Sequence, residues 1–135
     1  LDKDGIAYKE YAIADTNEVQ SVTTAAAGEC DVLYIPTDNT LASVTETVYN
    51  VVAPAKVPVI AGEEGICNGC GVATLSISYY DLGYATGEMA YEILAEGADI
   101  TTMDVRYAPN VTKKYNAKIC EELGITVPDD YVAIQ

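Results

Sequence analysis

The chain lacks histidine, phenylalanine and tryptophan altogether. The absence of histidine removes the Ser-His and Cys-His nucleophile pairs and the commonest zinc ligand, so hydrolytic enzymes and zinc proteins become poor interpretations. Catalysis by a carboxylate, lysine, tyrosine or cysteine side chain is still compatible with the composition. Tyrosine supplies all 11 aromatic residues, and we expect most of these rings to pack in the core.

Positive charge is also scarce. The sequence has 7 Lys and Arg residues against 21 Asp and Glu residues, a net charge of -14. Such a chain is repelled by phosphate backbones and by anionic lipid headgroups. The composition therefore argues against nucleic-acid binding and against binding to a membrane surface.

Cysteine and long apolar runs are limited as well. Four cysteines are too few for a disulfide scaffold, and no run of about 18 apolar residues could form a transmembrane helix. No signal-peptide pattern is present. Residues 1–5 resemble the end of a helix, so we expect the chain to be part of a longer protein.

What is present is an apolar chain of one-domain size, with 135 residues of which 50% are hydrophobic. Apolar runs and amphipathic segments alternate along it. Strands are predicted at 6–14, 31–36, 57–61, 72–78, 105–108 and 131–134, and helices at 18–27, 41–52, 81–96 and 116–123. This alternation predicts an α/β fold in three layers, a mostly parallel sheet with helices on both faces.

Ligands of open α/β sheets bind beyond the carboxyl ends of the strands. The loop after the predicted strand 31–36 carries Thr37, Asp38 and Asn39 at the start of a helix. Hydroxyl, carboxylate and amide groups beside free backbone N–H groups could hold both ends of a zwitterion. The alternative is that one of these side chains only caps the helix.

A second loop follows the predicted strand 57–61. Glu63 and Glu64 lie between Gly62 and Gly65, so two carboxylates could bind an ammonium group where the backbone can approach closely. The alternative is a solvated acidic turn in an acidic protein.

Cys67 and Cys70 form a CxxC pair inside the predicted glycine-rich loop 62–71. Redox pairs of this kind begin a helix, which lowers the pKa of the first thiol, whereas Asn68-Gly69 favours a turn. Without a second pair or a histidine no zinc site is complete. A local disulfide or two free thiols is therefore favoured over redox catalysis.

Several segments together resemble the ABC transporter substrate-binding family that includes tryptophan- and tyrosine-binding members. The matching segments are CDVLYIPTDNT at 30–40, VPVIAGE at 57–63, GVAT at 71–74, YYDLGYATGEMA at 79–90, Asn116, and ELGITVP at 122–128. Their order and spacing extend over nearly the whole chain. The CxxC pair departs from the family pattern.

The resemblance implies the type I periplasmic-binding-protein fold, in which two doubly wound, flavodoxin-like lobes clamp a ligand. It implies that residues 1–72 and 101–135 belong to the second lobe. The strand and helix in 73–100 would belong to the first lobe. That helix would lack much of its partner surface, which predicts self-association, rearranged packing or marginal stability.

The implied function is that of the solute-binding component of an ABC importer, not of an enzyme. It would take a small amine-bearing ligand, an amino acid, and deliver it to a membrane permease without any cofactor or metal. The implied location is extracytoplasmic, periplasmic or lipid-anchored at the outer face of the cell membrane. The implied ligand contacts are Thr37, Asp38, Asn39, Glu63, Glu64 and Gly65.

Glu64 is the favoured ammonium partner, because related branched-chain amino-acid binders resemble this loop with a Gly-x-Glu-Gly sequence. Two alternatives stay open. One is a flavodoxin-like redox protein or enzyme that uses Cys67 and Cys70, and the other is a ligand-sensing regulatory domain of the same fold.

Overall fold

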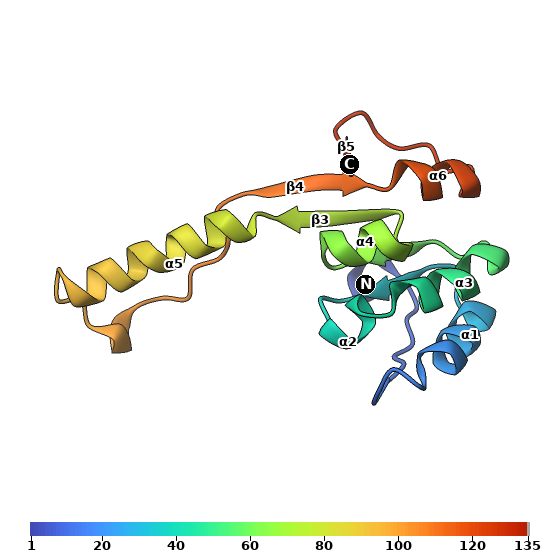
Figure 1. Cartoon of the computed structure of the whole chain (residues 1–135), viewed down its shortest axis with the longest axis horizontal. Coiled ribbons are helices and arrows are strands. Elements are labelled where there is room, and N and C mark those ends of the chain that lie inside the picture. The colour runs from blue at the N-terminus through green and yellow to red at the C-terminus, as the bar shows by residue number, and fades with distance from the viewer. Residues whose placement is uncertain (135) are drawn as a thin grey trace.

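The computed structural model describes residues 1–134, which form one five-stranded sheet with its strands in chain order (Figure 1). The strands are β1 (Leu33–Ile35), β2 (Val59–Ala61), β3 (Ala73–Ile77), β4 (Val111–Tyr115) and β5 (Val132–Ala133). The helices are α1 (Val19–Glu29), α2 (Asn39–Ala42), α3 (Thr45–Ala55), α4 (Glu64–Cys70), α5 (Tyr79–Leu94) and α6 (Ala117–Leu123). Two 3-10 turns, η1 (Asp2–Asp4) and η2 (Ile100–Thr102), complete the elements.

The predicted α/β fold with a mostly parallel sheet is confirmed. The pairs β1–β2, β2–β3 and β4–β5 are parallel, and β3–β4 is antiparallel. The antiparallel pair arises because the chain leaves the sheet after β3, extends away as α5 and returns directly into β4 (Figure 1). Within each parallel pair a helix makes the crossover, as parallel pairing requires.

One hydrophobic core lies between the sheet and three helices, α1, α3 and α4. Its buried members are Val19, Ile35, Val48, Val52, Val59, Ala61, Ile66, Cys67 and Cys70. Burying one such aliphatic side chain stabilises the fold by about 1.5–3 kcal/mol. Because these helices share one core, they cover the same face of the sheet. A smaller cluster forms where Ile119 and Cys120 of α6 pack against Val72, the residue before β3.

The opposite face of the sheet is less covered. Tyr34 on β1 is paired in register with Ile60 on β2, so both side chains lie on this face, and both are exposed. Leu75 of β3 is exposed too. Seven tyrosines are exposed, which corrects the expectation of core packing: Tyr8, Tyr34, Tyr79, Tyr80, Tyr84, Tyr91 and Tyr107.

Two predicted strands are wrong. Residues 6–14 are extended but belong to no strand of the sheet, because Lys9 and Tyr11 bond instead to Glu29 at the end of α1. Residues 105–108 also form no strand. They run beside α5, where Arg106 forms two hydrogen bonds with Glu92, so the returning strand begins only at Val111.

The predicted helix 41–52 is two helices, because the chain breaks at Ser43–Val44 between α2 and α3. The predicted glycine-rich loop 62–71 is also wrong, since residues 64–70 form α4. A glycine suits this helix because a Cβ at Gly69 would lie 2.1 Å from Thr45 Oγ1. Gly69 thus lets α4 approach α3 closely, which outweighs its low helix propensity.

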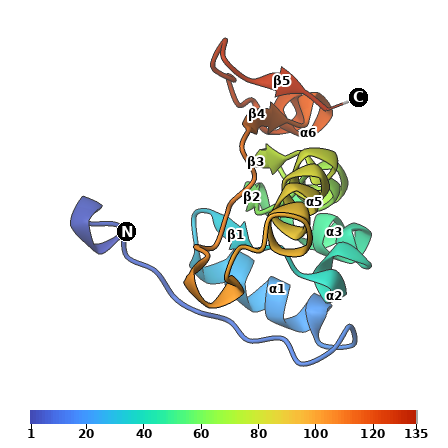
Figure 2. The same cartoon turned by 90° about the vertical axis from the view of Figure 1, so that its left-hand side faces the viewer.

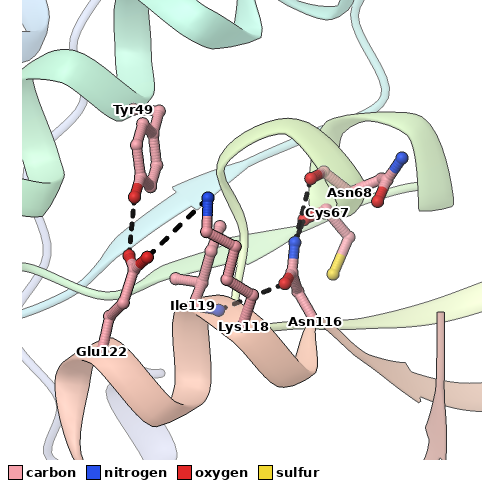
Figure 3. Close-up of polar contacts among 7 residues, drawn as sticks. All are labelled: Tyr49, Cys67, Asn68, Asn116, Lys118, Ile119 and Glu122. Atoms are coloured by element: carbon pink, nitrogen blue, oxygen red, sulfur yellow. Dashed lines mark hydrogen bonds and ion pairs between the residues drawn. The ribbon is translucent and has the colours of Figure 1, made fainter. Parts of the chain in front are cut away.

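Asn116 joins α4 to α6. Its Nδ2 donates to the carbonyls of Cys67 and Asn68, at 3.3 and 2.9 Å, and its Oδ1 accepts from Ile119 N at the start of α6 (Figure 3). One buried side chain thereby satisfies the end of one helix and the beginning of the next.

Helix α5 is confirmed, with Ser78 as its N-cap, and it extends away from the rest of the molecule (Figure 1). It contains no fully buried residue. The sequence predicts an apolar stripe of Leu82, Ala85, Met89, Ile93 and Leu94 on this helix. The first four are half-buried, but Leu94 is exposed, so its place in the stripe is wrong. Among residues 1–134, no helix has both the length and the apolar character needed to cross a membrane.

Candidate ligand site at the carboxyl ends of β1 and β2

The two loops predicted to bind a ligand lie side by side. Gly62 N donates to Ile35 O at 2.7 Å, and Thr37 Oγ1 donates to Gly62 O at 3.2 Å. A Cβ on Gly62 would lie 2.7 Å from Thr37 N, which is closer than real Cβ atoms approach. The parallel strands therefore bring both loops to one edge of the sheet, as the sequence predicts.

In the first loop, Asp38 is the N-cap of α2 and accepts a hydrogen bond from Leu41 N at 2.8 Å. Asn39 is the first residue of the helix. Thr37 and Asn39 are exposed and Asp38 is half-buried. The capping alternative is thus realised for Asp38, while the side chains on either side face solvent.

In the second loop, Glu63 is the N-cap of α4. Its carboxylate accepts from Gly65 N at 2.8 Å and from Ile66 N. Gly65 is exposed, and a Cβ there would lie 3.1 Å from Glu63 Oε1. Glu63 therefore caps a helix in the same way as Asp38 does. This N-cap explains why a helix begins within a glycine-rich segment.

Glu64 is held by two other strands. Its Oε2 accepts from Ser76 Oγ on β3 at 2.8 Å and from Lys114 Nζ on β4 at 2.7 Å. The hydrogen bond from Lys114, followed by that from Ser76, lowers the pKa of Glu64 below its ordinary value. Glu64 is therefore ionised at neutral pH, and its charge is paired with Lys114.

Sequence reasoning missed both partners of Glu64. Ser76 had a usable signal, because in the predicted strand 72–78 it lies on the same face as Val72 and Thr74, and all three are buried. Lys114 had none, because the returning strand was predicted at 105–108. Its approach to Glu64 depends on the antiparallel pairing of β3 with β4, in which Lys114 lies opposite Thr74.

The cysteines are free thiols, so the predicted alternative of a local disulfide is wrong. Cys67, Cys70 and Cys120 are buried. Burial raises the pKa of Cys67 and of Cys70 to about 12, with smaller contributions from nearby groups. This is the reverse of a redox motif, whose attacking thiol needs a depressed pKa and access to solvent.

A metal centre has no basis in the described residues. Among residues 1–134, no group of three or more His, Cys, Asp or Glu side chains could hold a metal ion. The carboxylates at the carboxyl ends of β1 and β2 are instead occupied by backbone N–H groups and by Lys114. What this edge offers is hydroxyl, amide and carboxylate groups, which suit a small polar organic ligand.

The chain is similar to known substrate-binding proteins. It is 39% identical over 100 residues to the tyrosine-binding protein of Clostridioides difficile strain R20291, covering 70% of this chain and 29% of that protein. It matches the ligand-free, open structure of a substrate binding protein with adhesive properties from Clostridium difficile, with a TM-score of 0.74 and 36% identity. That match covers 99% of this chain and 46% of the other.

A third similarity is to a domain from Streptococcus pneumonia solved in complex with L-Trp. The TM-score is 0.81 with 33% identity, over 95% of this chain and 43% of that structure. The chain thus spans less than half the length of these relatives. The family described as ABC transporter substrate binding protein matches residues 1–134, so the chain belongs to that family.

Proposed function

We propose that the protein is the solute-binding component of an ABC importer and binds an amino acid between two lobes. The observation that carries the proposal is the family match over residues 1–134. Similar proteins are named for tyrosine binding and were solved with L-Trp, which supports an aromatic amino acid. Substrate-binding proteins of this kind bind and release their ligand and are not enzymes.

The proposed contacts are Thr37, Asp38, Asn39, Glu63, Glu64 and Gly65, at the carboxyl ends of β1 and β2. Glu64 is the proposed partner of the ligand's ammonium group, because it is ionised and its side chain is 38% exposed. The exposed amide of Asn39 could donate to the carboxylate group of the ligand. The Thr37 hydroxyl donates its proton to Gly62 O, so it could accept a hydrogen bond from the ligand's ammonium group.

The proposed lobe assignment places 1–72 and 101–135 in one lobe and 73–100 in the other, with Gln135 itself outside the described residues. The position of α5, extended from the sheet and without a buried residue, supports it. In this arrangement β3 and β4 lead to and from the first lobe, to which α5 belongs. Ligand-induced closure would then present the protein to a permease at the outer face of the cell membrane.

Isothermal titration with L-tyrosine, L-tryptophan and tyramine tests the ligand class. Tyramine keeps the amine and ring but lacks the carboxylate, so we expect it to bind more weakly than either amino acid. Asp38→Asn and Glu64→Gln remove charge while keeping size, and Asn caps helices as well as Asp does. We expect at least a tenfold loss of affinity in each variant, which is about 1.4 kcal/mol.

Glu121→Gln is the matched control, because Glu121 is an exposed glutamate on α6, outside the proposed site. It should bind like the unaltered protein. If Asp38→Asn and Glu64→Gln both bind the amino acid as tightly as the unaltered protein, the proposed contacts are wrong, although the protein still binds an amino acid. Absence of binding by any amino acid would reject the ligand class itself.

A further inference from the structure

A lysine reaches the candidate ligand site from the strand that returns to the sheet. Lys114 Nζ donates to Glu64 Oε2 at 2.7 Å, and among the ion pairs within residues 1–134 this is the one that includes a proposed ligand contact. Figure 2 faces the edge of the sheet at which β1 and β2 end, with the strands in order from β1 to β5. Lys114 therefore approaches Glu64 from the β4 side, whereas Thr37 and Asn39 follow β1, on the other side of β2.

The pairing of β3 with β4 decides where the Lys114 side chain lies. Lys114 is opposite Thr74 in the antiparallel register, so the two side chains share one face of the sheet with Ser76, two residues further along β3. Thr74 and Ser76 are buried, whereas the side chains of Lys114 and Glu64 are 27% and 38% exposed. The ion pair thus rests against a buried part of the sheet and is open to solvent on its other side. Charges in such a place interact more strongly than they do in bulk water.

The other charged groups at this edge are acidic. The carboxylates of Asp38 and Glu63 accept hydrogen bonds from backbone N–H groups, which cap the helices but carry no net charge. The whole chain has a net charge of -14. Without Lys114, this edge would attract any small cation. Lys114 places a positive charge directly beside the carboxylate that is proposed to bind the ligand's ammonium group.

We propose that Lys114 determines which amines the site accepts, by disfavouring amines with a net positive charge and leaving zwitterionic amino acids as ligands. This inference rests on the proposed function, in which Glu64 binds the ammonium group. That group and Lys114 Nζ would share one carboxylate, closer together than the Debye length of about 8 Å at physiological ionic strength, so they repel each other. An amino acid carries a carboxylate on the same carbon atom as its ammonium group, which offsets the repulsion. A simple amine has no such group, so the site selects against it.

The ratio of two dissociation constants tests this proposal. L-tyrosine and tyramine share a ring and an amine, so dividing the Kd of tyramine by that of L-tyrosine cancels effects common to both. Titration calorimetry of the full chain gives the L-tyrosine value, and displacement of L-tyrosine gives the weaker tyramine value. We expect Lys114→Met to lower the ratio by about fivefold or more, because tyramine binds more tightly without the repelling charge. Lys114→Arg keeps the charge and should keep the ratio.

Lys113→Met is the matched control, because it removes the same charge from the neighbouring residue of β4. Lys113 is opposite Leu75, which is exposed on the other face of the sheet, and it pairs with Asp130. This variant should keep the ratio of the unaltered protein. If circular dichroism shows that Lys114→Met is unfolded, Lys114→Gln replaces it, since glutamine is uncharged and still offers a donor to Glu64.

Three results would overturn the proposal. An unchanged ratio in Lys114→Met, with L-tyrosine still bound, would show that Lys114 does not select the charge of the ligand, although the proposed function holds. An equal fall of the ratio in Lys113→Met would show that the net charge of the protein acts, and not the position of Lys114. Absence of binding of L-tyrosine and tyramine to the unaltered protein would reject the proposed function and this inference together.

Discussion

Gly62 sets the distance between the two loops of the candidate site. An added Cβ would meet Thr37 N at 2.7 Å and the carbonyl carbon of Pro36 at 2.9 Å, and both are backbone atoms that cannot move aside alone. We expect Gly62→Ala to lower the free energy of unfolding by about 1–3 kcal/mol. Urea denaturation measures this.

The matched control is Gly28→Ala. Gly28 lies inside α1, and a Cβ there would meet nothing within 4 Å. Alanine is the better helix former, so this variant should be more stable by about 0.5–1 kcal/mol. Equal urea midpoints for both variants would show that the loops can separate at little cost.

The Glu64–Lys114 pair predicts a pH dependence. The pKa of Glu64 is lowered in the folded state, so the pair stabilises the fold above the unfolded value, about 4.3. That stability is lost as the pH falls through the lower folded value. We expect Lys114→Met to be less stable than the unaltered protein at pH 7 and the difference to shrink below about pH 4.

Thermal unfolding across pH 3–7, with a carbon-13 titration of Glu64, measures both effects. Lys118→Met is the control, because Lys118 is 77% exposed and lies 3.8 Å from Glu122. Exposed pairs of this kind contribute little. A Glu64 pKa that does not rise in Lys114→Met would contradict the role of Lys114.

At the scale of elements, the packing of α4 and α6 buries three of the four thiols. Cys67 and Cys70 of α4 face the core, and Cys120 of α6 is buried beside Val72, where its Sγ donates to Val72 O at 3.4 Å. Only Cys30, which is half-buried, is partly accessible. We expect iodoacetamide to modify Cys30 in the native protein and the other three only after unfolding.

Mass spectrometry of the alkylated protein gives the sites directly. Rapid native alkylation of Cys67 would contradict the buried position and would restore the redox alternative. Unfolding in guanidinium provides the control, since all four thiols should then react.

Helix α5 should be a separate unit of stability, because no residue of it is fully buried. Elements with little buried surface open with a smaller free energy than the core. We expect α5 amides to exchange faster than those of α3. Gly83→Ala and Gly87→Ala, where a Cβ would meet nothing within 4 Å, should slow α5 exchange.

The urea midpoint of the core should stay the same in these two variants. Amide exchange and circular dichroism together measure both effects. Protection of α5 equal to that of α3 in the unaltered, monomeric protein would show that the helix is part of the core unit.

At the scale of the whole molecule, the net charge of -14 opposes the compact state. Salt screens this repulsion, with a Debye length of about 10 Å at 0.1 M ionic strength. We expect Tm to rise by a few degrees between 10 and 150 mM sodium chloride, which corresponds to about 1 kcal/mol. Calorimetry measures this, and choline chloride controls for specific sodium binding. A falling Tm would mean that the surface ion pairs outweigh the repulsion.

By itself, the sequence determined the α/β class, the buried strands β1 to β3, helix α5 and the loops that meet at the carboxyl ends of β1 and β2. Apolar periodicity and capping residues encode these features locally. Only the tertiary structure decided that 62–71 contains a helix, that 6–14 joins no strand, and that Lys114 reaches Glu64. Each of these three features depends on a contact with a distant residue. Asn116 bonds to the end of α4, Tyr11 bonds to Glu29, and β4 pairs with β3. Such contacts join residues far apart in the chain, where no local pattern records them.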